Sequence, residues 1–87
     1  MIYLVGYDLK KPGQDYTQLF DAIKAIGAWW HNLDSTWLLQ TSLSATDLFE
    51  RLRGTIDRSD RMLIISVGRD YSGWLSQDAW TWIKERI

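Results

Sequence analysis

The sequence contains no cysteine, a single histidine and almost no net charge, and each shortage limits the possible functions. Without cysteine the chain has no disulfide framework, no thiolate metal site and no cysteine nucleophile. The lone His31 excludes a metal site built from several histidines. A formal net charge of -1 argues against a basic surface spread over the whole molecule but leaves room for a local phosphate-binding patch.

Long apolar stretches are also absent, and no run approaches the ~20 residues that span a bilayer. The first residues are apolar and meet Asp8 early, a pattern without the basic start and longer apolar stretch of a signal peptide. We therefore expect a cytoplasmic protein. With 87 residues, 46% of them hydrophobic, and six Trp, the chain is expected to fold as one domain over residues 1–87.

Apolar residues recur with strand-like spacing in four places. Ile2 to Tyr7 and Met62 to Val67 are continuous apolar runs, which are typical of strands covered on both faces. We therefore predict that both runs lie in the middle of a sheet. Ala28 to Leu33 and Thr36 to Thr41 are separated by Asp34-Ser35, a pair suited to a tight turn, and are predicted to form a hairpin.

Three helices are predicted between and after these strands. The first begins with the Asp-x-x-Gln capping pattern of Asp15 and ends at Gly27. The second begins at Ser44, in a Ser-x-x-Asp pattern, and the third begins at Ser76 after a loop over 68–73. Residues at helical spacing supply their apolar faces, namely Tyr16, Leu19, Phe20, Ile23 and Ile26, then Leu48, Phe49, Leu52 and Ile56, then Ala79, Trp80, Ile83 and Ile87.

This order of elements predicts the fold class. A β-α-β-β-α-β order followed by a helix indicates an α+β protein, a ferredoxin-like βαββαβ sandwich with an additional C-terminal helix. Right-handed crossovers place the first two helices on one face of the sheet. The other face is left for a partner or for the C-terminal helix, and we expect it to form the surface of a homodimer.

Asp8 is the best single candidate for a functional residue. It follows the first strand and precedes Lys10-Lys11-Pro12-Gly13, so its carboxylate is predicted near the surface at the strand's carboxyl end. A hard oxygen ligand there can hold Mg²⁺ or Mn²⁺, above all when a two-fold axis supplies a second copy. The alternative is structural, because an aspartate after a strand often caps the loop through backbone amides.

Four short motifs resemble those of a known family. They are Tyr-Leu-Val-Gly-Tyr-Asp-Leu at 3–9, the break at Gly27, Ser-Thr-Trp-Leu at 35–38 and Asp-Arg-Met-Leu-Ile-Ile at 60–65. With them the chain resembles the small CRISPR-associated metal-dependent endoribonuclease family, the smaller subunit of the spacer-integration complex. It is still more similar to the SinR-like phage and bacterial relatives of that family.

The resemblance implies a role for Asp8 and a set of partners. In that family the aspartate at this position is the proposed metal ligand and catalytic residue, paired with its symmetry mate across a homodimer that acts on nucleic acid. The cation implied is Mg²⁺ or Mn²⁺. The chain departs from the family in having Asp15-Tyr16-Thr17-Gln18 where an arginine-rich helix start is usual, and in ending with a Trp-rich helix. These departures favour binding over catalysis.

Basic and aromatic side chains supply further candidates for a surface that binds phosphates and bases. The predicted substrate-binding residues are Lys10, Lys11, Arg58, Arg61, Arg69, Tyr71 and Trp74. Acidic residues, including Asp57 and Asp60, interleave with the arginines, a mixture that is usually a solvated surface. Trp37, Trp80 and Trp29 are expected in the core or at a dimer interface.

His31 has no paired acid in the sequence, so we expect a surface or hydrogen-bonded sheet residue, with a general base as the alternative.

Three functional hypotheses stay open. The first is a homodimeric module that binds nucleic acid or nucleotide phosphate, related to the CRISPR-associated nucleases. The second is a metal-dependent phosphodiesterase or ribonuclease using paired Asp8 carboxylates. The third is a protein-binding inhibitor, of phage or toxin-antitoxin type, that contacts a host or phage protein through exposed aromatic residues.

Overall fold

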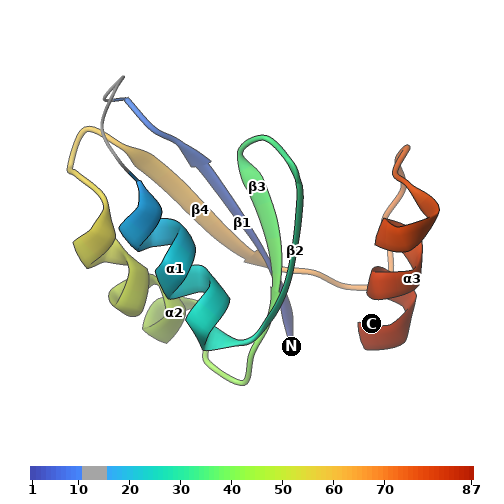
Figure 1. Ribbon diagram of the computed structural model, residues 1–87. Helices are drawn as coiled ribbons and strands as arrows, with labels where there is room; N and C mark the ends of the chain where they lie inside the picture. The colour runs from blue at the N-terminus through green and yellow to red at the C-terminus, as the bar shows by residue number, and fades with distance from the viewer. Residues whose placement is uncertain (11–15) are drawn as a thin grey trace.

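A computed structural model describes residues 1–10 and 16–87 and shows an α+β arrangement. Within these residues a four-stranded antiparallel sheet has the order β2-β3-β1-β4. Helices α1 and α2 cover one face, and α3 lies against the other (Figure 1). The elements are β1 (Ile2–Asp8), α1 (Thr17–Ile26), β2 (Ala28–Leu33), β3 (Thr36–Gln40), α2 (Ala45–Leu52), the short 3₁₀ helix η1 (Arg53–Thr55), β4 (Arg61–Ser66) and α3 (Gln77–Arg86).

The central position of β1 fixes the end of the sheet where the candidate residues gather. Its side chains are buried or half-buried on both sides up to Tyr7, as its continuous apolar sequence predicts, because α1 and α2 cover one face and α3 covers part of the other. On one side β1 pairs with β3, and on the other it pairs with β4, where Asp8 is the register partner of Arg61. The carboxyl end of β1 therefore lies beside the start of β4.

The predicted central position of the strand at 62–67 is wrong, because β4 is an edge strand. Met62 and Ile64 pack against the core beneath α1 and α2. Leu63 and Ile65 point to the other face and are 58% and 50% exposed. A continuous apolar run shows that both faces of a strand carry apolar side chains, but it does not determine how many strands lie beside it.

The face beneath α1 and α2 holds the larger core. Its fully buried side chains come from both helices and from the two central strands, and they are Tyr3, Val5, Leu19, Ile23, Trp37, Leu39, Leu48 and Leu52. The helix ends follow the predicted signals where the structure describes them. Ser44 Oγ accepts the backbone N–H of Asp47 at 3.1 Å, and α1 ends at Gly27, whereas the predicted cap at Asp15 lies outside the described residues.

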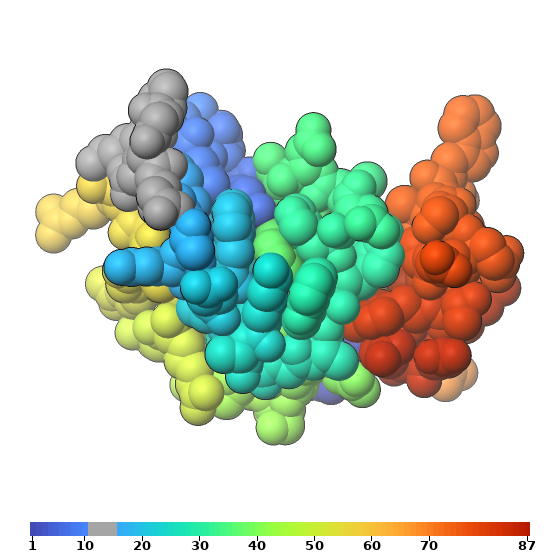
Figure 2. Space-filling view, in the orientation of Figure 1, coloured from blue at the N-terminus to red at the C-terminus, as the bar shows by residue number. Residues whose placement is uncertain are grey.

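Helix α3 covers part of the opposite face. Ala79 and Ile83 pack on Ile2, Trp30 and Leu38, and Ser76 Oγ caps the helix by accepting the N–H of Ala79 at 3.3 Å. The helix and the segment before it form a lobe on one side of the molecule (Figure 2). Among residues 1–10 and 16–87, no helix has the length and apolar character needed to cross a membrane.

Candidate functional site

The carboxyl end of β1 and the start of β4 form a charged corner of the molecule. Lys10 Nζ lies 2.6 Å from Asp8 Oδ2, and both side chains are exposed. Arg61 is the register partner of Asp8 on the neighbouring strand. The structure therefore brings together three predicted site residues, Asp8, Lys10 and Arg61, while Lys11 lies outside the described residues.

Asp60 holds this corner in place, and the expectation that it belongs to a solvated surface is wrong, because only 5% of the residue is exposed. Its Oδ1 accepts the backbone N–H of Lys10 at 2.8 Å and the hydroxyl of Tyr16 at 3.0 Å. Its Oδ2 accepts the backbone N–H of Asp57 at 2.8 Å. These hydrogen bonds lower the pKa of the Asp60 carboxyl. The bond from the Lys10 amide has the largest effect, and those from Asp57 and Tyr16 have smaller ones.

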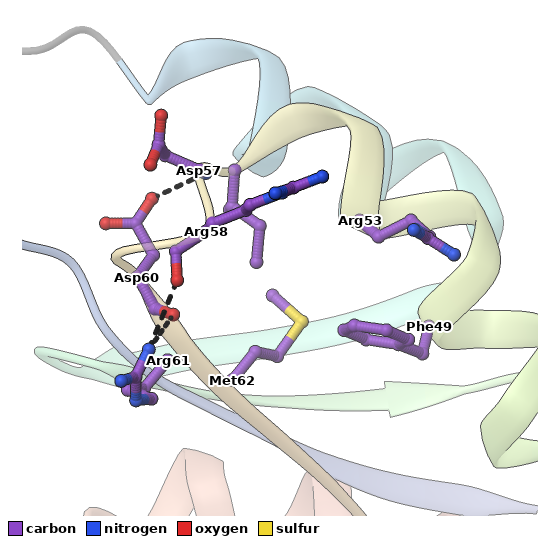
Figure 3. A pocket seen from close by; sticks show the side chains of 8 residues that line it. Phe49, Arg53, Asp57, Arg58, Asp60, Arg61 and Met62 are labelled. Carbon is purple, nitrogen blue, oxygen red and sulfur yellow. Dashed lines mark hydrogen bonds between the residues drawn. The ribbon is translucent and has the colours of Figure 1, made fainter.

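A cleft of about 420 Å³ opens beside this corner, between α2, η1 and the start of β4. Arginines and apolar side chains share its walls. In Figure 3 the Arg58 side chain runs across the cleft towards Arg53, with Met62 and the Phe49 ring on the opposite side. The complete lining is Phe49, Arg53, Ile56, Asp57, Arg58, Asp60, Arg61 and Met62.

The three arginines of the cleft differ in how they are held. Arg61 Nη1 donates to the carbonyl oxygens of Arg58 at 3.2 Å and Asp60 at 3.1 Å (Figure 3). Arg53 forms an ion pair with Glu50 at 3.2 Å. The Arg58 guanidinium has no hydrogen bond or ion pair with any residue in 1–10 or 16–87. Arg58 is therefore the cation at this site that is available to a ligand.

The remaining predicted binding residues lie elsewhere. Arg69, Tyr71 and Trp74 belong to the segment between β4 and α3, in the lobe seen in Figure 2. Tyr71 stacks on Trp80 of α3 with ring centroids 6.0 Å apart, and Trp74 is fully exposed. The expectation that Trp74 is hard to place in a core agrees with this exposure, but the structure does not unite the seven predicted binding residues in one surface.

A cluster of aromatic rings on the helix face accounts for His31. Its ring stacks on buried Trp37 with centroids 3.9 Å apart, and its Nδ1 lies 2.9 Å from the carbonyl oxygen of Thr36. Trp37 Nε1 donates to Tyr7 Oη at 2.9 Å, and burial raises the pKa of the Tyr7 hydroxyl. These contacts agree with the expectation of a hydrogen-bonded sheet residue.

Asp8 by itself offers limited ligation to a cation. In the described ranges no group of three or more His, Asp or Glu side chains is arranged to hold a metal ion. One chain thus supplies a single exposed carboxylate, which is already paired with Lys10. By strand alternation Asp8 lies on the same face as Leu4 and Gly6, away from α1 and α2.

Comparisons with protein-family models, with curated proteins and with solved structures gave no match for this chain. The sequence pointed to Asp8, Arg58 and Arg61, and Arg53 belongs to the same basic cluster over 51–61, but the sequence did not indicate the exposed ring of Phe49 or the buried role of Asp60. The Asp-x-x-Asp spacing of Asp57 and Asp60 was the available signal for a carboxylate that closes a turn on backbone amides.

Proposed function

We propose that this protein binds phosphate groups of nucleic acid or of a nucleotide in the cleft between α2 and β4. The observation that carries the proposal is the Arg58 guanidinium, which extends across the cleft without a partner in the described chain. It lies on the same side of the cleft as Arg53, whose own charge is paired with Glu50. A phosphate beside Arg58 would pair the charge of this guanidinium and accept bonds from its planar N–H groups, which match phosphate geometry.

The carboxylates near the cleft compete little with such an anion for Arg58, because their oxygens accept bonds from other groups. Both Asp60 oxygens already accept hydrogen bonds, and Asp57 Oδ1 accepts the backbone N–H of Ser59 at 3.0 Å. Arg61 Nη1 is held by two carbonyl oxygens, and Figure 3 shows its side chain on the other side of β4 from Met62, at the edge of the cleft. Lys10, whose backbone N–H is held by Asp60 and whose Nζ pairs with Asp8, lies at the same end of the sheet.

Fluorescence anisotropy with labelled single-stranded RNA and DNA tests this proposal. Arg58→Gln should weaken binding about 5- to 20-fold. It should also reduce the slope of log K against the logarithm of the salt concentration by roughly one, because one phosphate contact is lost. Arg51→Gln is the matched control, since Arg51 is exposed on α2 but does not line the cleft. Equal losses in the two variants, or no binding by the wild-type protein, would refute the cleft as the phosphate site.

We also propose a homodimer formed through the face that α3 leaves uncovered. Leu63 and Ile65 are exposed there, and the outer edge of β4 has no strand partner among residues 1–10 and 16–87. The strand order β2-β3-β1-β4 supports the ferredoxin-like arrangement in which this face would be shared.

Sedimentation equilibrium should show a dimer that Leu63→Glu dissociates. Leu33→Glu, at an exposed leucine on β2, should leave the dimer intact. A monomeric wild-type protein would contradict the proposal.

Metal-dependent phosphodiester cleavage is the alternative function, supported by the position of Asp8 on that uncovered face. Two copies would bring two Asp8 carboxylates towards a shared Mg²⁺ or Mn²⁺, which would neutralise the phosphate and activate water. RNA or DNA cleavage that requires the cation and disappears in Asp8→Ala is the expected result. Cleavage that persists in the variant excludes this role for Asp8. The relationship to the CRISPR-associated family stays a proposal that rests on the resemblance of short motifs.

A protein-binding function is supported by one observation, the full exposure of Trp74 beside the half-buried Leu75. Exposed tryptophans are typical of interface residues. A pull-down from lysate with and without nuclease treatment separates this function from nucleic-acid binding. Loss of every partner after nuclease treatment argues against it, whereas loss of a nuclease-resistant partner in Trp74→Ala supports it.

A further inference from the structure

Phosphate binding leaves one side of the α2–β4 cleft unexplained, namely the side formed by Phe49. Helical spacing predicts Phe49 on the buried face of α2, yet the residue is 38% exposed. Its neighbours Leu48 and Leu52 fill the core beneath the helix. The Phe49 ring is left at the edge of the core, where it lines the cleft.

One side of the cleft is cationic and the other is apolar, an arrangement that suits a planar heterocyclic ligand placed between them. In Figure 3 the guanidinium groups of Arg58 and Arg53 lie on one side, and the Phe49 ring and Met62 thioether lie on the other. Ile56 adds apolar surface to the lining. A bare phosphate would use only the cationic side. A planar, polarisable heterocycle can stack on a phenyl ring and meet a guanidinium on its other face.

We propose that the cleft binds a nucleobase together with its attached phosphate, with the base against Phe49 and the phosphate at Arg58. This inference rests on the proposed phosphate-binding function and adds the class of ligand. The cleft volume of about 420 Å³ lies within the range of small-ligand sites, roughly 300–1,000 Å³. The ligand is a free mononucleotide or an unpaired nucleotide of a single strand, and these two sources share the recognised chemistry.

Calorimetric titration of the full chain with paired ligands tests the base separately from the phosphate. AMP, GMP, CMP and UMP each carry a phosphate and a base, whereas ribose 5-phosphate carries the phosphate alone. Stacking of one base on an aromatic side chain contributes roughly 1–3 kcal/mol, which corresponds to a 5- to 150-fold higher affinity. At least one mononucleotide should therefore bind at least about fivefold more tightly than ribose 5-phosphate.

Substitutions at Phe49 locate the base. Phe49→Leu keeps apolar area but removes the ring, so it should abolish the advantage of the mononucleotide and leave ribose 5-phosphate binding unchanged. Phe49→Tyr keeps the ring and should retain the advantage. Because Phe49 is partly exposed, both variants are expected to fold, and their melting temperatures provide the check.

The outcomes separate this inference from the function on which it rests. If ribose 5-phosphate binds as tightly as every mononucleotide, and Arg58→Gln weakens both, the base site is wrong and the phosphate site stands. If no ligand binds and Arg58→Gln changes nothing, both are wrong. If Phe49→Leu keeps the full mononucleotide advantage, the base does not lie on Phe49. An RNA octamer that binds more tightly than its best mononucleotide identifies a single strand as the source, whereas equal affinity identifies the free nucleotide.

Discussion

The two faces of the sheet are built to different degrees of completeness. Beneath α1 and α2, eight fully buried side chains form a continuous core. On the opposite face, α3 completes a cluster of five, while Leu63 and Ile65 stay exposed on β4. Within the described chain, the buried side-chain nitrogens without a partner, Trp30 Nε1 and Arg86 Nε, both lie on the α3 side.

This difference separates a closed core from a face on which apolar side chains stay exposed. The core beneath α1 and α2 buries its apolar side chains entirely within this chain. The α3 face combines exposed Leu63 and Ile65 with a lobe that carries the exposed Trp74.

Two adjacent leucines on β3 provide the sharpest test of this contrast, because they point to opposite faces. Leu39 is buried beneath α1 and α2, and Leu38 packs with α3. Leu39→Ala should lower the free energy of unfolding by about 3–5 kcal/mol, and Leu38→Ala by about 2–3 kcal/mol. Urea unfolding followed by circular dichroism measures both values. Equal losses would mean that the α3 face is packed as tightly as the other.

A substitution at Gly27 tests how closely the connection from α1 to β2 packs against β3. A Cβ at this position would lie 2.0 Å from the carbonyl oxygen of Gln40, so the connection from α1 to β2 would have to move. Gly27→Ala is expected to cost about 1–3 kcal/mol. Gly54→Ala is the control, because a Cβ there meets nothing within 4 Å, and its effect should stay below about 0.5 kcal/mol. Similar losses in the two variants would contradict the steric explanation.

Much of the fold follows from local sequence signals. Ser44 and Ser76 cap α2 and α3, Gly27 ends α1, and Asp34-Ser35 joins β2 to β3, as the sequence predicts. Each of these features depends on the chemistry of a few neighbouring residues. The edge position of β4 depends instead on the pairing of distant strands, and Leu63 has the same sequence character whether its face is covered by this chain or by another.

The candidate site was predictable only in part for the same reason. The position of Asp8 at the end of β1 and the pair Arg58 and Arg61 could be inferred from sequence. The bond from the Lys10 amide to Asp60 joins residues 50 positions apart, and no local pattern indicates it. Phe49 was misplaced because helical spacing gives the direction of a side chain but not the depth of the core beneath it.

Asp60 gives a pH-dependent prediction that concerns the joint between β1 and β4. Hydrogen bonds lower its pKa from 3.8 in the folded chain, so its contribution to stability is present above about pH 4 and is lost as the pH falls through the lowered folded pKa. Thermal unfolding of Asp60→Asn should show a lower melting temperature at pH 7, by roughly 5–10 °C, and a weaker pH dependence below about pH 4.

Asp21→Asn is the matched control for Asp60, because Asp21 is an exposed aspartate on α1. It should keep both the wild-type melting temperature and the wild-type acid dependence. If Asp60→Asn unfolds in acid along the wild-type curve, another carboxyl group controls the transition and the buried contact to Lys10 contributes little.

Trp74 should show the smallest effect on the isolated chain, because its side chain is fully exposed. Trp74→Ala is expected to change the free energy of unfolding by less than about 0.5 kcal/mol in dilute solution. Urea unfolding at two protein concentrations, about a hundredfold apart, sharpens the comparison of the two faces. An effect that grows with concentration places Trp74 in the contact between copies, since only the assembled state would then bury it. A large loss at the lowest concentration would instead show that the lobe before α3 packs on its own chain, and the α3 face would be more complete than its exposed residues indicate.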